Sequence, residues 1–261
     1  MMDTTNDGRA RMKNDNRNLR GRTALVTGGA RRVGAVIAEQ LHAEGMNVVV
    51  HYKKSEADAR NLARRLNDRR RDSAVTAQAD LANVSGMESL IKASLQWDGL
   101  HVLVNNASSF YKTPVGQVTE EEWDDLMASN LRAPFFLSQF AAPHLRKSHG
   151  SIVNLLDIHA KRPLKEHTVY STAKAGLAML TLSLARELGP EVRVNGVAPG
   201  PVMWPDKGLD AATKRSILEA TALKRKGSPE DVAGAVLYLV RDAEYVTGQI
   251  LAIDGGRSIG W

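Results

Sequence analysis

The chain has 261 residues, enough for one large α/β domain, with a formal net charge of +6 and no cysteine. The absence of cysteine excludes disulfides and thiolate metal sites, and we expect no metal centre. No apolar run approaches the ~20 residues that span a bilayer, and the basic run 60–72 is explained by the solvated face of an amphipathic helix. We therefore expect a cytoplasmic protein that binds neither membranes nor nucleic acid.

Residues 1–20 are polar and charged, so we expect a disordered tail without the apolar segment of a secretory signal. Strand and helix patterns then alternate along residues 21–261. Short runs rich in valine, isoleucine and leucine, typical of strands buried on both faces, occupy 22–28, 46–52, 73–81, 100–108, 150–158, 192–200 and 248–256. Helical patterns occupy 32–44, 55–70, 85–96, 119–147, 168–188 and 228–240.

This alternation predicts a single Rossmann-like α/β domain. Its core would be a doubly wound parallel sheet of about seven strands, with helices on both faces. Right-handed crossovers place the carboxyl ends of the strands along one edge, where ligands bind. The long irregular segment 199–226 is expected to form a lid over that edge.

The first strand runs into "TGGARRVG", residues 27–34, which is nearly a dinucleotide-binding fingerprint. Such a turn brings the amides of the next helix toward a pyrophosphate. Arg32 stands where the fingerprint carries a small residue, and a purely structural glycine turn is the alternative interpretation. We expect cofactor contacts from Thr27, Gly28, Arg31, Arg32, Val33 and Gly34.

The end of the second strand, "HYKKSEA", favours NADPH as the cofactor. An acidic residue about 20 positions past the turn would bind the ribose of NAD, but no acid occurs here before Glu56. Lys53, Lys54 and Ser55 instead suit a 2′-phosphate, unless the lysines are merely solvated. Asp80 is expected to accept from the adenine amino group. Further cofactor contacts are expected from His51, Tyr52, Leu81, Asn106, Ala107, Ser108, Pro199 and Gly200.

Tyr170 and Lys174 lie four residues apart and would share one face of the helix 168–188. We expect the ammonium to lower the pKa of the phenol, so that Tyr170 can exchange a proton near neutral pH. Lys174 would also hold the nicotinamide ribose, so both residues count as cofactor contacts. Asp157 ends the fifth strand, and Asn130 is placed to hold a water that links Lys174 to solvent. These four residues form the expected catalytic set.

The motifs "TGGARRVG", "NNAS", "YSTAK" and "RVNGVAPGPV", with Asn130, resemble the short-chain dehydrogenase/reductase family from residue 22 onward. Ordinary members carry Ser where this chain has Asp157, and Gly where it has Arg32 and Ser108. These departures are similar to the pteridine reductases, as are "HYKKSEA", "NNASSFY" and "DGGRSIGW". The resemblance implies a homotetramer that uses NADPH to reduce a dihydropterin or dihydrofolate to the tetrahydro form, with the oxidised pterin as a further candidate substrate.

In that interpretation hydride goes to a ring carbon and Tyr170 donates a proton to the adjacent nitrogen. Arg32 would bridge the cofactor pyrophosphate and the pterin edge. Phe110 would be one face of a sandwich whose other face is the nicotinamide. Substrate contacts are expected from Arg32, Ser108, Phe110, Asp157, Tyr170 and Trp204.

Other interpretations stay open at this stage. Phe110 is alternatively a packing residue, and Asp157 a helix-capping acid. The protein is alternatively a short-chain reductase of a small ketone, keto-ester or quinone. A catalytically silent NADP-binding regulator is the alternative from another class, although intact Tyr170, Lys174 and Asn130 argue against it.

Overall fold

The computed structural model describes residues 18–204 and 209–259. Seven parallel strands form one sheet in the order β3-β2-β1-β4-β5-β6-β7. The strands are β1 Thr23–Val26, β2 Asn47–Tyr52, β3 Ala74–Gln78, β4 Val102–Asn105, β5 Ser151–Leu155, β6 Arg193–Pro199 and β7 Ile250–Ile253. The chain winds outward from β1 first in one direction and then, from β4, in the other. The predicted Rossmann-like, doubly wound α/β fold is therefore confirmed.

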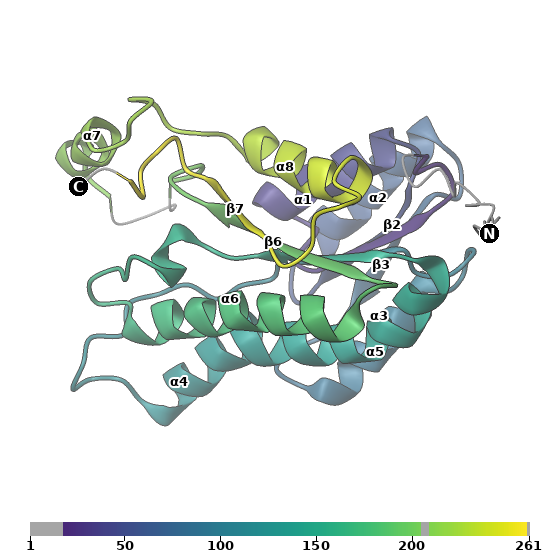
Figure 1. Ribbon diagram of the computed structural model, residues 1–261, viewed down its shortest axis with the longest axis horizontal. Coiled ribbons are helices and arrows are strands. Elements are labelled where there is room, and N and C mark those ends of the chain that lie inside the picture. The colour runs from purple at the N-terminus through teal and green to yellow at the C-terminus, as the bar shows by residue number, and fades with distance from the viewer. Residues whose placement is uncertain (1–17, 205–208, 260–261) are drawn as a thin grey trace, which may run out of the picture.

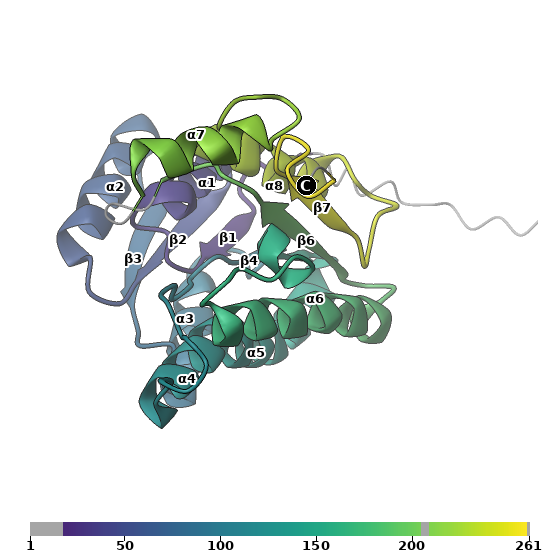
Figure 2. The ribbon, with the colours of Figure 1, turned by 90° about the vertical axis from the view of Figure 1, so that its left-hand side faces the viewer.

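Helices cover both faces of the sheet (Figures 1 and 2). Helices α1, α2 and α8 lie over one face, and α3, α5 and α6 lie over the other. The helices are α1 Arg32–Ala43, α2 Glu56–Arg69, α3 Val84–Ser94, α4 Glu120–Met127, α5 Ala133–Ser148, α6 Thr168–Leu188, α7 Ala211–Glu219 and α8 Pro229–Arg241. Within the described part of the chain, no helix has the length and apolarity that crossing a membrane requires.

The strands are hydrophobic along their whole length because both of their faces are covered. Successive side chains of a strand point to opposite faces. Val26 of β1 accordingly packs in the same cluster as Ile37 of α1, whereas its neighbour Leu25 packs with Leu137 of α5. Two separate cores therefore hold the sheet between its helical layers, as a continuous run of valine and leucine predicts.

The long helix predicted over 119–147 is interrupted. One π-helical turn, Ala128–Arg132, separates α4 from α5. Within this turn Asn130 Nδ2 donates to the carbonyl of Leu126, four residues earlier, at 3.0 Å. A side chain that takes the carbonyl of the preceding turn competes with the regular backbone ladder, so the helix widens at this point. The interruption turns Asn130 inward, where it is fully buried.

The segment 199–226, predicted to be irregular, contains helix α7. Asp210 caps this helix, because its Oδ1 accepts from the Thr213 amide at 2.6 Å. The prediction of a disordered tail falls mostly on residues 1–17, which lie outside the described residues. Leu19, inside the predicted tail, is buried in the core cluster that contains α1 and α8. The ordered fold therefore starts earlier than the composition indicated.

A buried chain of polar side chains links β4, β5 and α6. Asn105 Nδ2 donates to Asn154 Oδ1 at 2.9 Å, and Asn154 Nδ2 donates to Thr181 Oγ1 at 2.9 Å. All three residues are almost completely shielded from solvent. Because no water reaches these groups, each depends on its partner for hydrogen bonding.

Asn154→Ala should therefore destabilise the fold, since it leaves Asn105 and Thr181 each without one buried partner. Each orphaned group costs about 1–3 kcal/mol in the free energy of unfolding. Urea unfolding measures this loss. Ser183→Ala on the exposed side of α6 is the matched control, and its effect should stay within about 0.5 kcal/mol. Equal stability of the two variants would contradict the role given to this chain.

Candidate active site

A cavity of about 1160 Å³ opens at the carboxyl edge of the sheet. Most of the residues expected to bind cofactor or substrate line it. They are Gly28, Arg31, Arg32, Val33, Gly34, His51, Lys53, Asp80, Leu81, Asn106, Ala107, Ser108, Phe110, Asp157, Tyr170, Pro199, Gly200 and Trp204. Of the other predicted site residues, Thr27, Asn130 and Lys174 are buried behind the cavity wall, and Tyr52, Lys54 and Ser55 lie outside its lining.

The turn between β1 and α1 is built on close backbone approach. A Cβ at Gly34 would lie 2.3 Å from the carbonyl oxygen of Gly28, which only glycine permits. Gly28 itself has φ +59°. Thr27 fixes the turn from behind, because its Oγ1 accepts from the amides of Asn106 at 2.8 Å and Ala107 at 3.0 Å. The start of α1 is thereby held against the end of β4.

This turn fits the pyrophosphate of a dinucleotide. The N-cap residue of α1, Arg31, makes no side-chain capping bond, and the first turn of the helix contains no acid. An uncapped helix N-terminus without carboxylates attracts an anion through its amides and its dipole. The N-terminal residues Arg32, Val33 and Gly34 all line the cavity.

His51, at the end of β2, supports the glycine turn. The Gly28 amide donates to His51 Nδ1 at 3.0 Å, and His51 Nε2 lies 3.1 Å from the carbonyl oxygen of Ala79. An amide only donates and a carbonyl only accepts, so the ring is neutral with its proton on Nε2. Burial lowers the pKa of His51, in agreement with this assignment. The sequence indicated a cofactor contact here, and the structure adds this supporting role.

Lys53 and Asp80 form an ion pair in the lining of the cavity. Lys53 Nζ lies 3.0 Å from Asp80 Oδ2, and both side chains are partly exposed. The pKa of Asp80 is lowered by the hydrogen bond from the Ala82 amide and by Lys53. An ammonium thus stands at the end of β2, where no acid precedes Glu56. Lys54 and Ser55 lie outside the lining, so Lys53 has the most direct access to a ligand.

Arg32 begins α1 with φ +53°, in the left-handed region that favours glycine. Its guanidinium extends across the cavity and lies 3.5 Å from the carbonyl oxygen of Trp204. A side chain in this conformation costs roughly 1–2 kcal/mol relative to glycine. Strain of this kind is concentrated at functional sites. The backbone therefore accommodates the arginine at a cost, which supports a role for the guanidinium in the cavity.

Arg32→Gly and Arg32→Ala remove the same guanidinium but differ in backbone freedom. The glycine variant should be more stable by about 1 kcal/mol, because only alanine retains the left-handed strain. Urea unfolding of the pair measures this difference. Arg64, an exposed residue in the interior of α2, is the control position, and there the glycine variant should be less stable than the alanine variant by about 1 kcal/mol. The same ranking at both positions would refute strain at Arg32.

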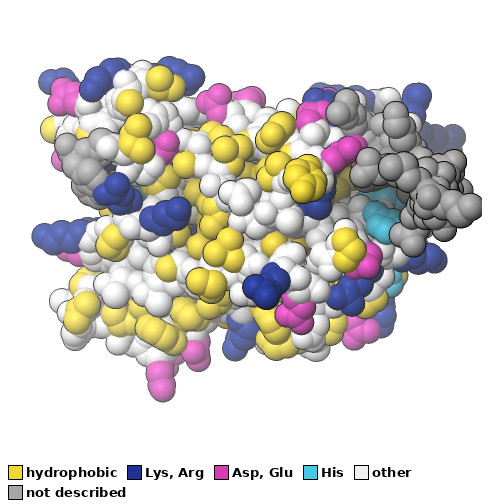
Figure 3. Space-filling view, viewed as in Figure 1, with side chains coloured by type: hydrophobic (Ala, Val, Ile, Leu, Met, Phe, Trp, Pro, Cys, Tyr) yellow, Lys and Arg dark blue, Asp and Glu magenta, His cyan; other side chains and the backbone are white. Residues whose placement is uncertain are grey.

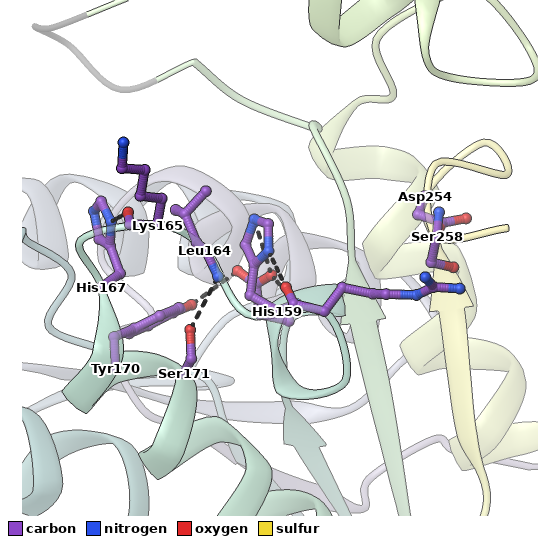
Figure 4. A network of polar contacts seen from close by, with 10 residues as sticks. His159, Leu164, Lys165, His167, Tyr170, Ser171, Asp254 and Ser258 are labelled. Carbon is purple, nitrogen blue, oxygen red and sulfur yellow. Dashed lines mark hydrogen bonds and ion pairs between the residues drawn. The ribbon is translucent and has the colours of Figure 1, made fainter. Parts of the chain in front are cut away.

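The phenol of Tyr170 meets the carboxylate of Asp157 at the centre of the cavity. Tyr170 Oη donates to Asp157 Oδ2 at 2.8 Å. Tyr170, only 4% exposed, points from α6 toward the turn after β5 that carries His159 (Figure 4). Burial and the Asp157 carboxylate raise the pKa of Tyr170 well above its usual value. The expected lowering of the Tyr170 pKa is therefore wrong for this structure, because burial and the adjacent Asp157 carboxylate both raise it.

Lys174 lies behind Tyr170, with its Nζ 5.7 Å from the centre of the phenol ring. It is 3% exposed and donates to the carbonyl of Leu155 at 2.8 Å. Burial lowers the pKa of Lys174 to about 8, while Asp157 acts in the opposite direction. The shared helix face of Tyr170 and Lys174 is thus confirmed in geometry.

Asn130 holds the segment after β4. Its Oδ1 accepts from Ser108 Oγ at 2.9 Å, and its Nδ2 donates to the carbonyl of Ser109 at 3.0 Å. The carboxamide therefore positions the hydroxyl that faces the cavity. Its expected role in holding a water stays a prediction.

Phe110 is 48% exposed and lines the cavity. One of its faces stacks on the ring of His167, with centroids 4.7 Å apart and planes inclined by 17°. The Tyr170 ring meets Phe110 edge-on at 4.8 Å. His167 and His159 could not be predicted as site residues, because each lies in a connection between a strand and a helix, where no periodicity marks a functional side chain. Both line the cavity.

Comparison with known proteins identifies the class to which this fold and site belong. Residues 28–258 match the family model described as enoyl-(acyl carrier protein) reductase. The chain belongs to the short-chain dehydrogenase/reductase family, whose members are oxidoreductases that use a nicotinamide cofactor.

Individual relatives carry several different names. Pteridine reductase 1 of Leishmania tarentolae is 39% identical over 90% of this chain and 96% of its own length. A 3-oxoacyl-[acyl-carrier-protein] reductase of Staphylococcus aureus is 36% identical over 90% of this chain and 97% of its own. The 3beta-hydroxysteroid dehydrogenase 1 of Eggerthella lenta is 34% identical over 92% of this chain and 95% of its own.

Proposed function

We propose that this protein is a pteridine reductase, which uses NADPH to reduce a dihydropterin or dihydrofolate to the tetrahydro form. The observation that carries the proposal is the hydrogen bond from Tyr170 to Asp157 in the cavity. A carbonyl oxygen is reduced most readily when neutral or positive donors surround it, and a carboxylate there would repel the developing alkoxide. A ring nitrogen instead requires a single proton donor that can be recharged.

The other cavity residues suit a flat heteroaromatic substrate. Phe110 presents a partly exposed ring, which can stack on a planar bicycle. Arg32 supplies a guanidinium that can meet both a pyrophosphate and an oxo-substituted ring edge. Ser108, Asp157, Tyr170 and Trp204 complete the set of proposed substrate contacts, and all of them line the cavity.

NADPH is the proposed cofactor because Lys53 lies at the end of β2 within the cavity lining. When bound, the reduced nicotinamide would supply the hydride. The turn of Gly28 and Gly34 would hold the pyrophosphate, and Lys53, with Lys54 and Ser55 nearby, the 2′-phosphate. Lys174 would hold the ribose, and Tyr170 would deliver the proton to the substrate nitrogen.

A short-chain reductase of a ketone, keto-ester or quinone is the second candidate. The names of the Staphylococcus aureus and Eggerthella lenta relatives favour it, because both refer to chemistry at oxygen. Asp157 argues against this candidate for the electrostatic reason given above.

Exposed apolar side chains support a homo-oligomer, which we propose to be a tetramer in the cytoplasm. Figure 3 shows hydrophobic side chains gathered over the face formed by α6, β7 and α8. Met179, Leu182, Tyr238 and Leu251 are large exposed hydrophobic residues of these elements. An apolar surface of this kind is typical of contacts between subunits.

The proposed function is tested by mixing the protein with NADPH or NADH and following absorbance of the reduced nicotinamide. We expect NADPH oxidation with dihydrobiopterin or dihydrofolate, and slower or no oxidation with a panel of ketones and quinones. NADH should be the poorer cofactor. Oxidation with ketones but not with pterins would overturn the proposal in favour of the second candidate.

Tyr170→Phe should abolish most turnover while leaving NADPH binding nearly intact. The phenol acts in the proton-transfer step, which typically contributes ~10²–10⁴-fold. Lys174→Ala should weaken both turnover and cofactor binding, since the ammonium also faces the ribose. Steady-state kinetics and fluorescence titration with NADPH separate these effects. An equal loss of cofactor affinity in the two variants would contradict the division of roles.

Arg32→Gly should raise the Michaelis constant for the pterin by roughly tenfold to a hundredfold at saturating NADPH. A lost charge-assisted hydrogen bond is worth ~1.5–3 kcal/mol, which corresponds to this range. Arg31→Ala is the comparison, because it should change the constant for NADPH rather than that for the pterin. Unchanged pterin kinetics in Arg32→Gly would contradict a contact between Arg32 and the substrate, and would leave Arg32 as a contact to the cofactor phosphates alone.

A further inference from the structure

His159 lies on the turn after β5, two residues beyond Asp157, and lines the same cavity (Figure 4). Its backbone amide donates to Asp157 Oδ1 at 2.9 Å, and its ring Nε2 lies 4.0 Å from the same oxygen. The other oxygen of the carboxylate accepts from Tyr170. Asp157 therefore stands between a phenol on one side and an imidazole on the other.

The orientation of the imidazole is fixed by its second nitrogen. His159 Nδ1 lies 2.8 Å from the carbonyl oxygen of Arg162, which can only accept. Nδ1 therefore carries the hydrogen, and in the neutral ring Nε2 holds a lone pair on the side of Asp157. Protonation takes place at Nε2, where it converts a long contact into a charge-assisted pair with the carboxylate.

Catalysis at Tyr170 creates a need for such a group. Once the phenol has given up its proton, a phenolate that is 4% exposed and a carboxylate lie 2.8 Å apart. Two like charges at this distance strongly favour uptake of a proton. Lys174 lies behind the ring, and its pKa, lowered to about 8 by burial, leaves it a weak source of positive charge above that pH.

We propose that His159 is a second entry point for protons to this site, acting through Asp157, beside the route expected through Lys174 and Asn130. The substrate nitrogen gains the proton of Tyr170 as the phenolic O–H bond breaks. His159 Nε2 gives its proton to Oδ1 of Asp157, and the carboxyl group turns so that this new hydroxyl faces Tyr170. The phenolate then takes that proton, Asp157 returns to the carboxylate, and the imidazole regains a proton from water. These steps are proton transfers, and none of them changes an oxidation state. The proposal rests on the proposed role of Tyr170 as donor, but not on the identity of the substrate.

Other charged groups lie around the cavity that contains His159, and they contribute to the electrostatic potential at its ring. Asp157 lies on the same turn, with its Oδ1 4.0 Å from His159 Nε2. On α6 these groups are Tyr170, which lines the cavity, and Lys174, buried behind it, and Arg162 follows on the same turn as His159. The other titratable and charged groups that line the cavity are Arg31, Arg32, His51, Lys53, Asp80, Tyr111, Lys112, Asp125, His167 and Arg257. His167 differs from His159 because its ring stacks on Phe110.

NMR of protein labelled with ¹⁵N-histidine tests the geometry without any substrate. Neutral His159 should show the Nδ1–H tautomer, with the signal assigned by its loss in His159→Asn. Asp157→Asn, which preserves shape but removes the charge, should shift the Nε2 resonance of His159, because the carboxylate oxygen 4.0 Å from that nitrogen is replaced. An Nε2–H tautomer, or an Nε2 resonance unchanged in Asp157→Asn, would overturn the proposal whatever the enzyme reduces.

Kinetics test the relay itself, with whichever substrate of the panel the wild type turns over. His159→Asn retains an N–H for the Arg162 carbonyl but lacks Nε2, so kcat should fall about tenfold while both Michaelis constants stay within twofold. The histidine donates in its charged form, so its contribution is present at low pH and disappears as pH rises through its titration. The wild-type kcat should fall over that range, and the variant should lack this step.

Chemical rescue separates proton supply from mere support. Added imidazole should restore much of the kcat lost in His159→Ala, because the cavity beside Asp157 admits a small base. His149→Asn, at the left-handed residue that ends α5, is the control and should keep wild-type kinetics and pH profile. The proposal would be overturned if His159→Asn kept the wild-type kcat and pH profile. It would also be overturned if His159→Ala lost kcat and added imidazole did not restore it. If the wild type were inactive on the whole panel, that result would count against the proposed function. The NMR experiment would still show whether His159 Nε2 faces Asp157 as the proposal requires.

Discussion

The hydrogen bond between Tyr170 and Asp157 constrains everything else in the cavity. A phenol and a carboxylate that share one buried position cannot both be ionised without a large electrostatic cost. The pair therefore keeps its proton on Tyr170 near neutral pH, and the raised pKa of the phenol expresses this fact. In the proposed function, release of that proton to a substrate must be coupled to the arrival of another. The surrounding groups, Lys174 behind the ring and His159 on the far oxygen, are placed where such coupling is possible.

The parallel sheet explains why residues distant in sequence meet at this pair. Arg32 follows β1, Phe110 follows β4 and Asp157 follows β5, and these strands are neighbours in the sheet. Because parallel strands end at the same edge, the segment after each one reaches the same cavity. Tyr170 enters from α6, the crossover between β5 and β6. The fold supplies the proximity, and the individual side chains supply the chemistry.

Much of this arrangement could be predicted from the sequence. Buried parallel strands appear as continuous apolar runs, and the residues that follow these runs lie at the carboxyl edge of the sheet. The failures have physical causes. Helix α7 buries no residue completely, so it left no hydrophobic periodicity to find. The π-helical turn at Asn130 arises from competition between a side chain and the backbone, which periodicity does not register. The stacking of Phe110 on His167 joins segments far apart in the chain, and the direction of the Tyr170 pKa depends on Asp157, which lies thirteen residues away in sequence.

Arg32, Ser108 and Asp157, the three departures from the ordinary family pattern, form one consistent change. The usual serine at the position of Asp157 offers a hydrogen to a carbonyl oxygen, whereas a carboxylate can only accept from Tyr170 or repel an anion. Ser108 brings a hydroxyl to the same cavity, held by Asn130. Arg32 adds a positive group opposite, at a backbone conformation that glycine would adopt without strain. These features agree with the proposed function. A site that lacks a hydrogen-bond donor to oxygen at this position, and that gains a cation at the cost of backbone strain, would suit a substrate whose proton goes to a ring nitrogen and whose polar edge is electron-rich.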